Sequence, residues 1–172
     1  LALIPSVPAS YANAQWTWQL GRIYSAQGLL EQATANYSDA VSQLTLLQDE
    51  IVALNPDTKF SFRQRIEPVY RNYIELLLSN IEKQTEAIQQ QRLKQARDAM
   101  ESLQLAELQN YFREACLTYQ TREIGAIDPR AAIVYPIVLN KRLEIIVAEP
   151  NQPIQHLRED IDVIDLTSFL LN

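Results

Sequence analysis

Apolar residues recur every three or four positions over two proline-free stretches near the start of the chain. This spacing predicts one helix over residues 11–26 and a second over residues 30–54. Gly28 lies between the two stretches and predicts the turn. Because the second stretch ends at Asn55-Pro56, where proline interrupts a helix, the pattern indicates a helical hairpin.

The helical spacing continues, with one interruption, to residue 117. Residues 59–79 predict a helix in which Pro68 marks either a kink or a fresh start. Residues 81–91 are rich in glutamine and charge, which indicates a polar extension or a loop between helices. Residues 93–117 predict a further helix. The apolar positions of these two helices are Phe62, Ile66, Tyr70, Tyr73 and Leu77, then Ala96, Met100, Leu103, Leu105, Leu108 and Phe112.

The pattern changes after residue 129 to short, β-branched apolar runs. Residues 131–139 and 143–148 flank a polar turn and predict a β-hairpin, in which Pro136 indicates an edge strand or a bulge. The first run is apolar on both faces, so its sheet should be covered on both sides. Few elements follow to cover it, and the hairpin should be under-covered. A third short strand is an option around residues 153–158, and residues 160–171 resemble the start of a helix.

The predicted fold is therefore mainly α, with helical hairpins followed by a small C-terminal β-hairpin. The length of 172 residues and a hydrophobic content of 47% are those of a folded globule. The formal net charge of -6 and the lack of a dense basic patch argue against nucleic acid as a partner. The sequence contains no apolar run of about 18 residues, so it predicts no membrane-spanning segment. Both ends of the sequence look truncated, so we expect this chain to be a piece of a larger protein.

Cys116 and His156 are the chain's single cysteine and single histidine, which raises the question of a catalytic dyad. In caspase-type enzymes the histidine precedes the cysteine, and here the order is reversed. We therefore expect a buried structural thiol and a surface histidine. Acidic residues such as Glu159, Asp160 and Asp162 have no His or Cys at ligand spacing. We predict no metal, no cofactor and no catalytic residue.

Small and large residues alternate regularly between residues 20 and 40 in a way that resembles a tetratricopeptide repeat. Small side chains would let the two helix backbones approach, and large ones would fill the remaining space. The matching residues are Leu20, Gly21, Tyr24, Ala33, Tyr37 and Ala40, with Gly28 at the turn. Two features depart from the pattern. The usual large residue of the first helix falls on Thr17, between Trp16 and Trp18, and the second helix runs past the usual repeat end.

The repeat register also predicts a binding surface on the first helix. It places Gln15, Trp18, Arg22 and Ser25 where that helix faces the concave groove, and we predict that these four residues bind a partner. The alternative is that Trp18 packs on a preceding repeat. The side chains of residues i and i+2 in a helix point in directions that differ by about 200° around the helix axis. We therefore expect Trp16 and Trp18 to differ in exposure.

Several segments along nearly the whole chain resemble the CHAT-domain proteins of bacteria, whose tetratricopeptide repeats precede a caspase-like and separase-like domain. These segments are Phe60-Ser-Phe-Arg63, Glu67-Pro-Val-Tyr70, Gln95-Ala-Arg-Asp98, Glu101-Ser-Leu-Gln-Leu-Ala-Glu-Leu108, Tyr111-Phe-Arg-Glu-Ala-Cys116, Ala131-Ala-Ile-Val-Tyr-Pro-Ile-Val-Leu139 and Arg142-Leu-Glu144. The resemblance implies a helical region over residues 1–122 and the first strands of a CHAT domain over residues 123–172. It also implies a cysteine protease with a His and Cys dyad, whose two motifs are missing here.

The expected function is a protein-interaction scaffold that positions a protein or peptide partner for an attached protease-like domain, or regulates that domain. We do not expect this chain to be an enzyme. One alternative is an adaptor with no protease relationship, and another is a cysteine peptidase fragment. The C-terminal strands also offer a route to self-association. A cytoplasmic location is favoured, although a lost signal sequence would change it.

Overall fold

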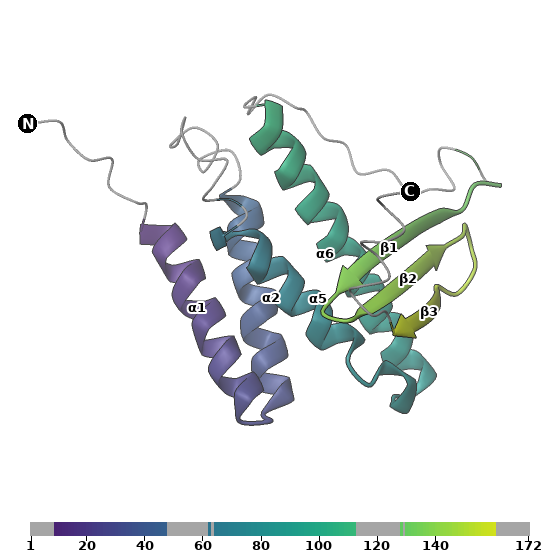
Figure 1. Cartoon of the computed structure of the whole chain (residues 1–172), viewed down its shortest axis with the longest axis horizontal. Helices are drawn as coiled ribbons and strands as arrows, with labels where there is room; N and C mark the ends of the chain where they lie inside the picture. Colours follow the sequence, from purple (N-terminus) through teal and green to yellow (C-terminus); the bar gives the residue numbers. More distant parts are fainter. Residues whose placement is uncertain (1–8, 48–61, 63, 113–127, 129, 161–172) are drawn as a thin grey trace, which may run out of the picture. The chain divides into compact units, whose positions relative to one another are not determined.

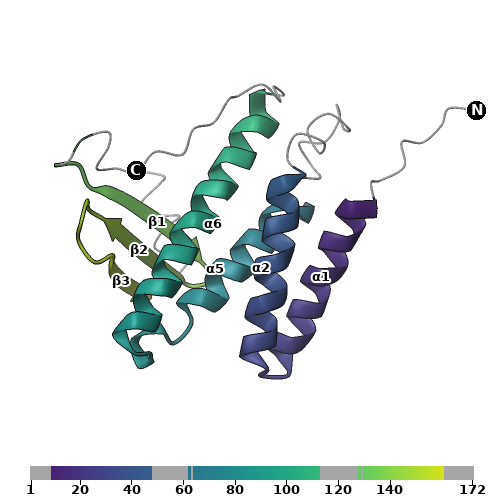
Figure 2. The same ribbon diagram turned by 180° about the vertical axis from the view of Figure 1, so that it is seen from behind.

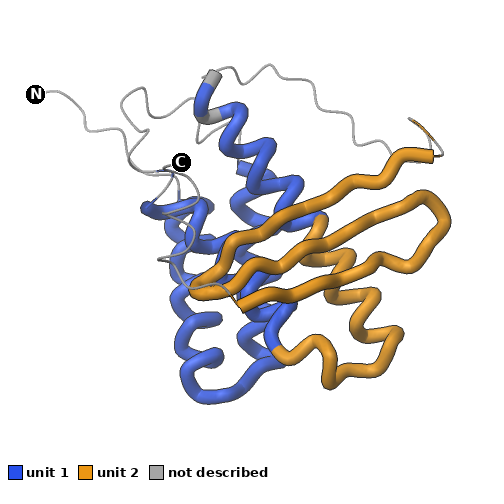
Figure 3. Tube along the Cα trace, turned by 45° about the vertical axis from the view of Figure 1, so that its right-hand side comes forward, with its two compact units in different colours: residues 1–79, 98–118 blue, residues 80–97, 119–172 orange. Residues whose placement is uncertain are grey.

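The computed structural model describes residues 9–47, 62, 64–112, 128 and 130–160 of the chain. These residues form four α-helices, one short 3-10 helix and one three-stranded antiparallel sheet (Figure 1). The predicted mainly α fold with a small C-terminal β element is confirmed. The chain divides into two compact units, residues 1–79 with 98–118 and residues 80–97 with 119–172 (Figure 3). The predicted boundary between residues 122 and 123 lies outside the described residues.

The first two helices form the predicted hairpin. Helix α1 (Ala9–Ala26) and helix α2 (Leu30–Leu46) lie side by side in both views of the ribbon (Figures 1 and 2). Gly28 has a φ of 75°, a left-handed conformation that glycine adopts without steric cost. The backbone N–H of Leu29 donates to the carbonyl of Tyr24 at 2.9 Å, which closes the turn after α1. The continuation predicted for the second helix to residue 54 lies outside the described residues.

Small residues bring α1 and α2 into close contact, as the repeat pattern predicts. A Cβ atom added to Gly21 would lie 2.6 Å from Cδ1 of Tyr37, so no larger residue fits without movement of that ring. Ala33 and Ala40 on α2 are fully buried. The expectation that Leu20 fills the contact is wrong, because its side chain is 41% exposed on another face of α1.

Helix α5 (Glu67–Leu78) packs on α2 and completes the apolar core that the sequence predicts for residues 59–79. Pro68 lies in the first turn, where its missing N–H costs nothing, so it marks a fresh start and not a kink. The hydroxyls of Tyr70 and Thr45 lie 3.2 Å apart and tie α5 to α2. All five predicted core residues are buried, namely Phe62, Ile66, Tyr70, Tyr73 and Leu77.

The long helix α6 (Glu86–Phe112) begins seven residues before the predicted start at residue 93. It follows a short 3-10 helix, η1 (Ile81–Lys83). The polar residues that suggested a loop are good helix formers, and Glu86 in the first turn complements the helix dipole. Their polarity therefore reflects an exposed helix face. The expectation that Leu108 joins the apolar stripe is wrong, because its side chain is exposed.

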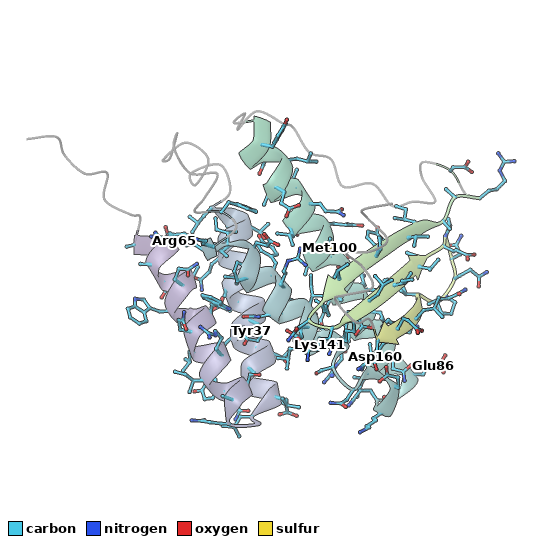
Figure 4. The ribbon with its side chains drawn as sticks, in the orientation of Figure 1. Tyr37, Arg65, Glu86, Met100, Lys141 and Asp160 are labelled. Carbon is cyan, nitrogen blue, oxygen red and sulfur yellow. The ribbon has the colours of Figure 1, made fainter. Side chains whose placement is uncertain are left out.

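The C-terminal unit contains the predicted hairpin and a third strand, close to the optional strand around residues 153–158. Strands β1 (Ile133–Leu139), β2 (Arg142–Ala148) and β3 (Gln155–Asp160) form an antiparallel sheet in the order β1-β2-β3. Pro136 lies in β1, an edge strand, as predicted. The tight turn between β1 and β2 has Lys141 at a φ of 62° (labelled in Figure 4).

The two faces of this sheet differ in burial. One face carries the buried side chains Tyr135, Ile137, Leu139, Glu144, Ile146 and Ala148. On the other face, Val134, Val138 and Leu157 are 55%, 50% and 60% exposed. The expectation of a sheet covered on both sides is therefore wrong for the described residues, whereas the expected under-coverage is present.

A glutamine joins the first half of α6 to the start of the third strand within the same unit. The side-chain amide of Gln90 donates to the carbonyl of Ile154 at 2.9 Å and accepts from its backbone N–H at 2.8 Å. Both backbone groups of Ile154 are thus satisfied by one side chain just before β3 begins. This pair fixes the entry to the strand.

Candidate functional site

The four predicted partner-binding residues follow one side of α1 at helical spacing. Two of them donate hydrogen bonds to residues of the same unit that lie outside α1. The side-chain amide of Gln15 donates to the carbonyl of Arg65 at 2.9 Å, and the indole N–H of Trp18 donates to Oδ1 of Asn72 at 3.0 Å (Arg65 is labelled in Figure 4). This side of α1 therefore faces the segment that contains α5.

Trp18 and Arg22 form a stacked pair on the same side of the helix. The guanidinium carbon of Arg22 lies 5.2 Å from the centre of the Trp18 ring, which is the geometry of a cation–π contact. One guanidinium nitrogen, Nη1, also donates to Oε1 of Gln19 at 3.0 Å. Trp18 is buried while Arg22 is exposed, so the ring supports a charged group that faces solvent.

The fourth predicted residue, Ser25, lies near Tyr37 of α2, where its side chain lowers the pKa of the phenol. The structure thus brings all four residues to one side of α1, and each has an intramolecular contact. Asn72, which sequence reasoning missed, belongs with them. The one sequence feature that points to Asn72 is its polar side chain between Tyr70 and Tyr73 of the buried stripe. Binding of a partner by these residues stays a prediction.

Three tyrosines of the helical unit have pKa values above the usual 10.0. Burial is the main cause of the raised pKa in Tyr11, Tyr37 and Tyr73. The positive charge of Arg65 opposes the rise at Tyr11, and that of Arg22 opposes it at Tyr37. All three phenols therefore stay protonated to a higher pH than a free tyrosine does.

A second surface of α1 is apolar and exposed. Trp16, Leu20 and Ile23 recur at intervals of four and three residues, so they share one face of the helix. Trp16 is 75% exposed, while Trp18 is buried. This difference confirms the prediction that the two tryptophans differ in exposure.

The sheet carries a buried ionic cluster that the sequence did not reveal. Both carboxylate oxygens of the fully buried Glu144 lie close to basic side chains. Oε2 is 2.7 Å from Nε2 of His156, and Oε1 is 2.6 Å from Nε of Arg142. The second contact has the distance of an ion pair, but Nε is not oriented for a hydrogen bond to that oxygen. The cluster joins β2 to β3.

This cluster changes the interpretation of the histidine. The expectation of a surface histidine is wrong, because the His156 side chain is only 11% exposed and faces Glu144. The histidine lies opposite Ile146 in the strand register, so it reaches the carboxylate diagonally. Cys116 lies outside the described residues. Within the described ranges, no three His, Cys, Asp or Glu side chains gather as a metal site would require.

Comparisons with known proteins return no relative. Neither the scan against family models nor the searches of curated proteins and of solved structures found a match. None of the helices in the described part of the chain combines the length and the hydrophobicity needed to cross a membrane.

Proposed function

We propose that this chain is a protein-interaction scaffold of tetratricopeptide type that binds a protein or peptide partner on the α1 side defined by Gln15, Trp18, Arg22 and Ser25. The observation that supports it best is the exposed guanidinium of Arg22 held over the ring of Trp18. A stacked guanidinium loses less conformational freedom on binding than a free one. It also presents a planar fork of donors that suits a carboxylate or a peptide carbonyl.

The neighbouring contacts support the same surface. The hydrogen bond from Trp18 to Asn72 fixes the indole, and the bond from Gln15 to the Arg65 carbonyl fixes the next turn of α1. A partner would therefore meet side chains already held in place.

A peptide-display selection tests this proposal. Random peptides are selected on the full chain, and the affinities of enriched peptides are measured by calorimetry for Arg22→Ala and for a control, Gln32→Ala, on the exposed surface of α2. We expect Arg22→Ala to weaken binding about ten-fold, a loss of about 1.4 kcal/mol, and Gln32→Ala to leave it unchanged. Peptides that bind both variants as tightly as the parent would contradict the proposal.

The attached domain in this proposal is a CHAT-type, cysteine-protease-like domain that the bound partner serves or regulates. Its support is the resemblance of several segments along the sequence, including residues 131–139 in and before β1 and Arg142-Leu-Glu144 in β2. An adaptor unrelated to proteases is the competing proposal. The sequence of the parent protein after residue 172 distinguishes the two proposals. The CHAT proposal requires a His-Gly segment and then a Cys motif there, and the adaptor proposal does not.

The proposal assigns no peptidase activity to the chain itself. His156, its single histidine, contacts Glu144 and is mostly shielded from solvent. We expect any trace hydrolysis of a peptide library to be the same for the parent and for Cys116→Ser. Thiol-dependent cleavage that disappears in Cys116→Ser would instead favour the peptidase fragment.

A further inference from the structure

One side of α1 carries a stripe of exposed residues that packs on neither α2 nor α5. Helix α1 contacts α2 through Gly21 and α5 through Trp18, and both of these residues are buried. A turn of about 100° per residue places the stripe on another side, within about 80° of the helix circumference. We call this set the outer stripe, and it consists of the exposed residues Asn13, Trp16, Leu20, Ile23 and Gln27. The backbone N–H of Gln27 donates to the carbonyl of Ile23 at 3.1 Å, so Gln27 continues the helical path.

The outer stripe carries no charge, although the chain has a net charge of -6. The one charged residue of α1 is Arg22, which points about 200° away from Leu20 around the helix axis. An exposed helix face normally carries charged and polar side chains, and three of the five residues here are large and apolar. Such a surface marks an interaction site. Two copies of this acidic chain would meet there without placing acidic side chains opposite each other.

The order of residues along the outer stripe is symmetric about Leu20. Trp16 lies four residues before Leu20 and Ile23 three residues after it, at about 6 Å and about 4.5 Å along the axis. Asn13 and Gln27 each lie seven residues away, at about 10.5 Å. In both directions from Leu20, a large apolar residue is therefore followed by a side-chain amide.

This symmetry favours a second copy of the chain as the occupant. A contact around a two-fold axis requires a surface that is its own complement, whereas a contact with a different protein does not. With the axis beside Leu20, two antiparallel α1 helices bring Trp16 of each copy against Ile23 of the other. Asn13 likewise meets Gln27, and side-chain amides offer both donors and acceptors. We propose that the outer stripe pairs with the same stripe of a second copy, as a two-fold dimer with antiparallel α1 helices.

The dimer is weak, and it leaves the proposed partner-binding side of α1 uncovered. One helix from each copy forms the contact, which is smaller than the about 800 Å² per partner of a standard interface, so association is reversible. Trp18 and Arg22 lie on a different side of the helix. This inference therefore does not depend on the proposed function.

Sedimentation equilibrium of the free chain over a series of concentrations tests the dimer. We expect the parent to show a monomer–dimer equilibrium. Leu20→Glu should weaken association about ten-fold or more, because it buries two facing carboxylates at the axis. Leu46→Glu, at an 84% exposed site on α2, makes the same substitution and should leave association unchanged. Arg22→Ala should also leave it unchanged.

A mixture of two charge variants tests the two-fold symmetry itself. Residue 20 faces residue 20 of the second copy only if the axis passes beside it. Leu20→Glu mixed with Leu20→Lys should therefore associate about ten-fold more tightly than either variant alone, since opposite charges then meet. Circular dichroism shows whether each variant keeps the parent fold. If Leu20→Glu does not fold, Trp16→Glu, at a 75% exposed site, takes its place and should also weaken association.

Three results would overturn the proposal. A parent chain that stays monomeric at every concentration would mean that the outer stripe does not bind a second copy. A dimer that the stripe variant and Leu46→Glu affect equally would place the interface elsewhere. Folded Leu20→Glu and Leu20→Lys chains that do not associate when mixed would contradict the two-fold axis beside Leu20.

Discussion

The helical hairpin and the sheet bury their apolar residues in different ways. In the hairpin, Gly21 and Ala33 let α1 and α2 approach, and α5 covers α2 with a row of buried tyrosines and aliphatic residues. In the sheet, one face is buried around Glu144 while the opposite face leaves Val138 and Leu157 exposed. The described helices thus supply the hairpin with most of its packing, whereas side chains on one face of the sheet stay exposed to solvent.

The largest expected effect concerns the ionic cluster that anchors the buried face. Glu144→Ala removes the carboxylate shared by Arg142 and His156 and leaves the mostly buried guanidinium without that charge. Loss of one partner of a buried pair costs about 3 kcal/mol of unfolding free energy. Urea titrations followed by the NMR signals of the strands measure this. Glu159→Ala, at an exposed site, is the control, and equal stabilities of the two variants would contradict the role of the cluster.

The next largest effect is expected from variants that disrupt the close contact between α1 and α2. Gly21→Leu would place a side chain where Tyr37 already lies, and Ala33→Leu would enlarge a fully buried site. Overpacking of this kind costs about 1 to 3 kcal/mol for each variant. Ala35→Leu makes the same change at an exposed position of α2 and should melt with the parent. If thermal melts of all three variants coincide, the small residues do not set the helix contact.

A smaller effect is expected from alkaline pH, and it should affect the helical unit first. Burial raises the folded-state pKa of Tyr11, Tyr37 and Tyr73 above the unfolded value of 10.0. The stabilisation is complete below pH 10, where both states are protonated. It is lost as pH rises from 10 through the folded pKa, because the unfolded state then releases protons more readily.

Absorbance at the phenolate band and circular dichroism follow this transition together. Tyr73→Phe should reduce the loss of stability on the alkaline side, whereas Tyr111→Phe, at an exposed tyrosine of α6, should not. An alkaline transition that is the same in both variants would show that the buried phenol of Tyr73 does not contribute.

Periodicity predicted the helical region more completely than the sheet. The five core residues from Phe62 to Leu77, the turn at Gly28 and the edge position of Pro136 are all local features of the sequence. The early start of α6 was missed because a polar helix face and a polar loop have similar compositions. Leu20 and Leu108 were misplaced because local periodicity does not settle which apolar face is covered.

The contacts of the candidate sites depend on pairing that no local pattern shows. The bond between Trp18 and Asn72 joins residues 54 positions apart, and the bond between Glu144 and His156 depends on the register of β2 and β3. Helical spacing alone sufficed to place the four predicted partner-binding residues on one side of α1. Their partners, the Arg65 carbonyl and Asn72 of α5, could be identified only from the fold.

Amide hydrogen exchange of the free chain tests the contrast between the two regions most directly. We expect amides of the buried residues of α2 and α5, such as Tyr37, Leu44 and Ile74, to exchange only through global unfolding. Amides of β1 and β2, such as Ile137 and Ile146, should exchange faster through local opening. Strand amides as protected as those of α2 and α5 in the free, monomeric chain would mean that the sheet is already complete, and would contradict the account.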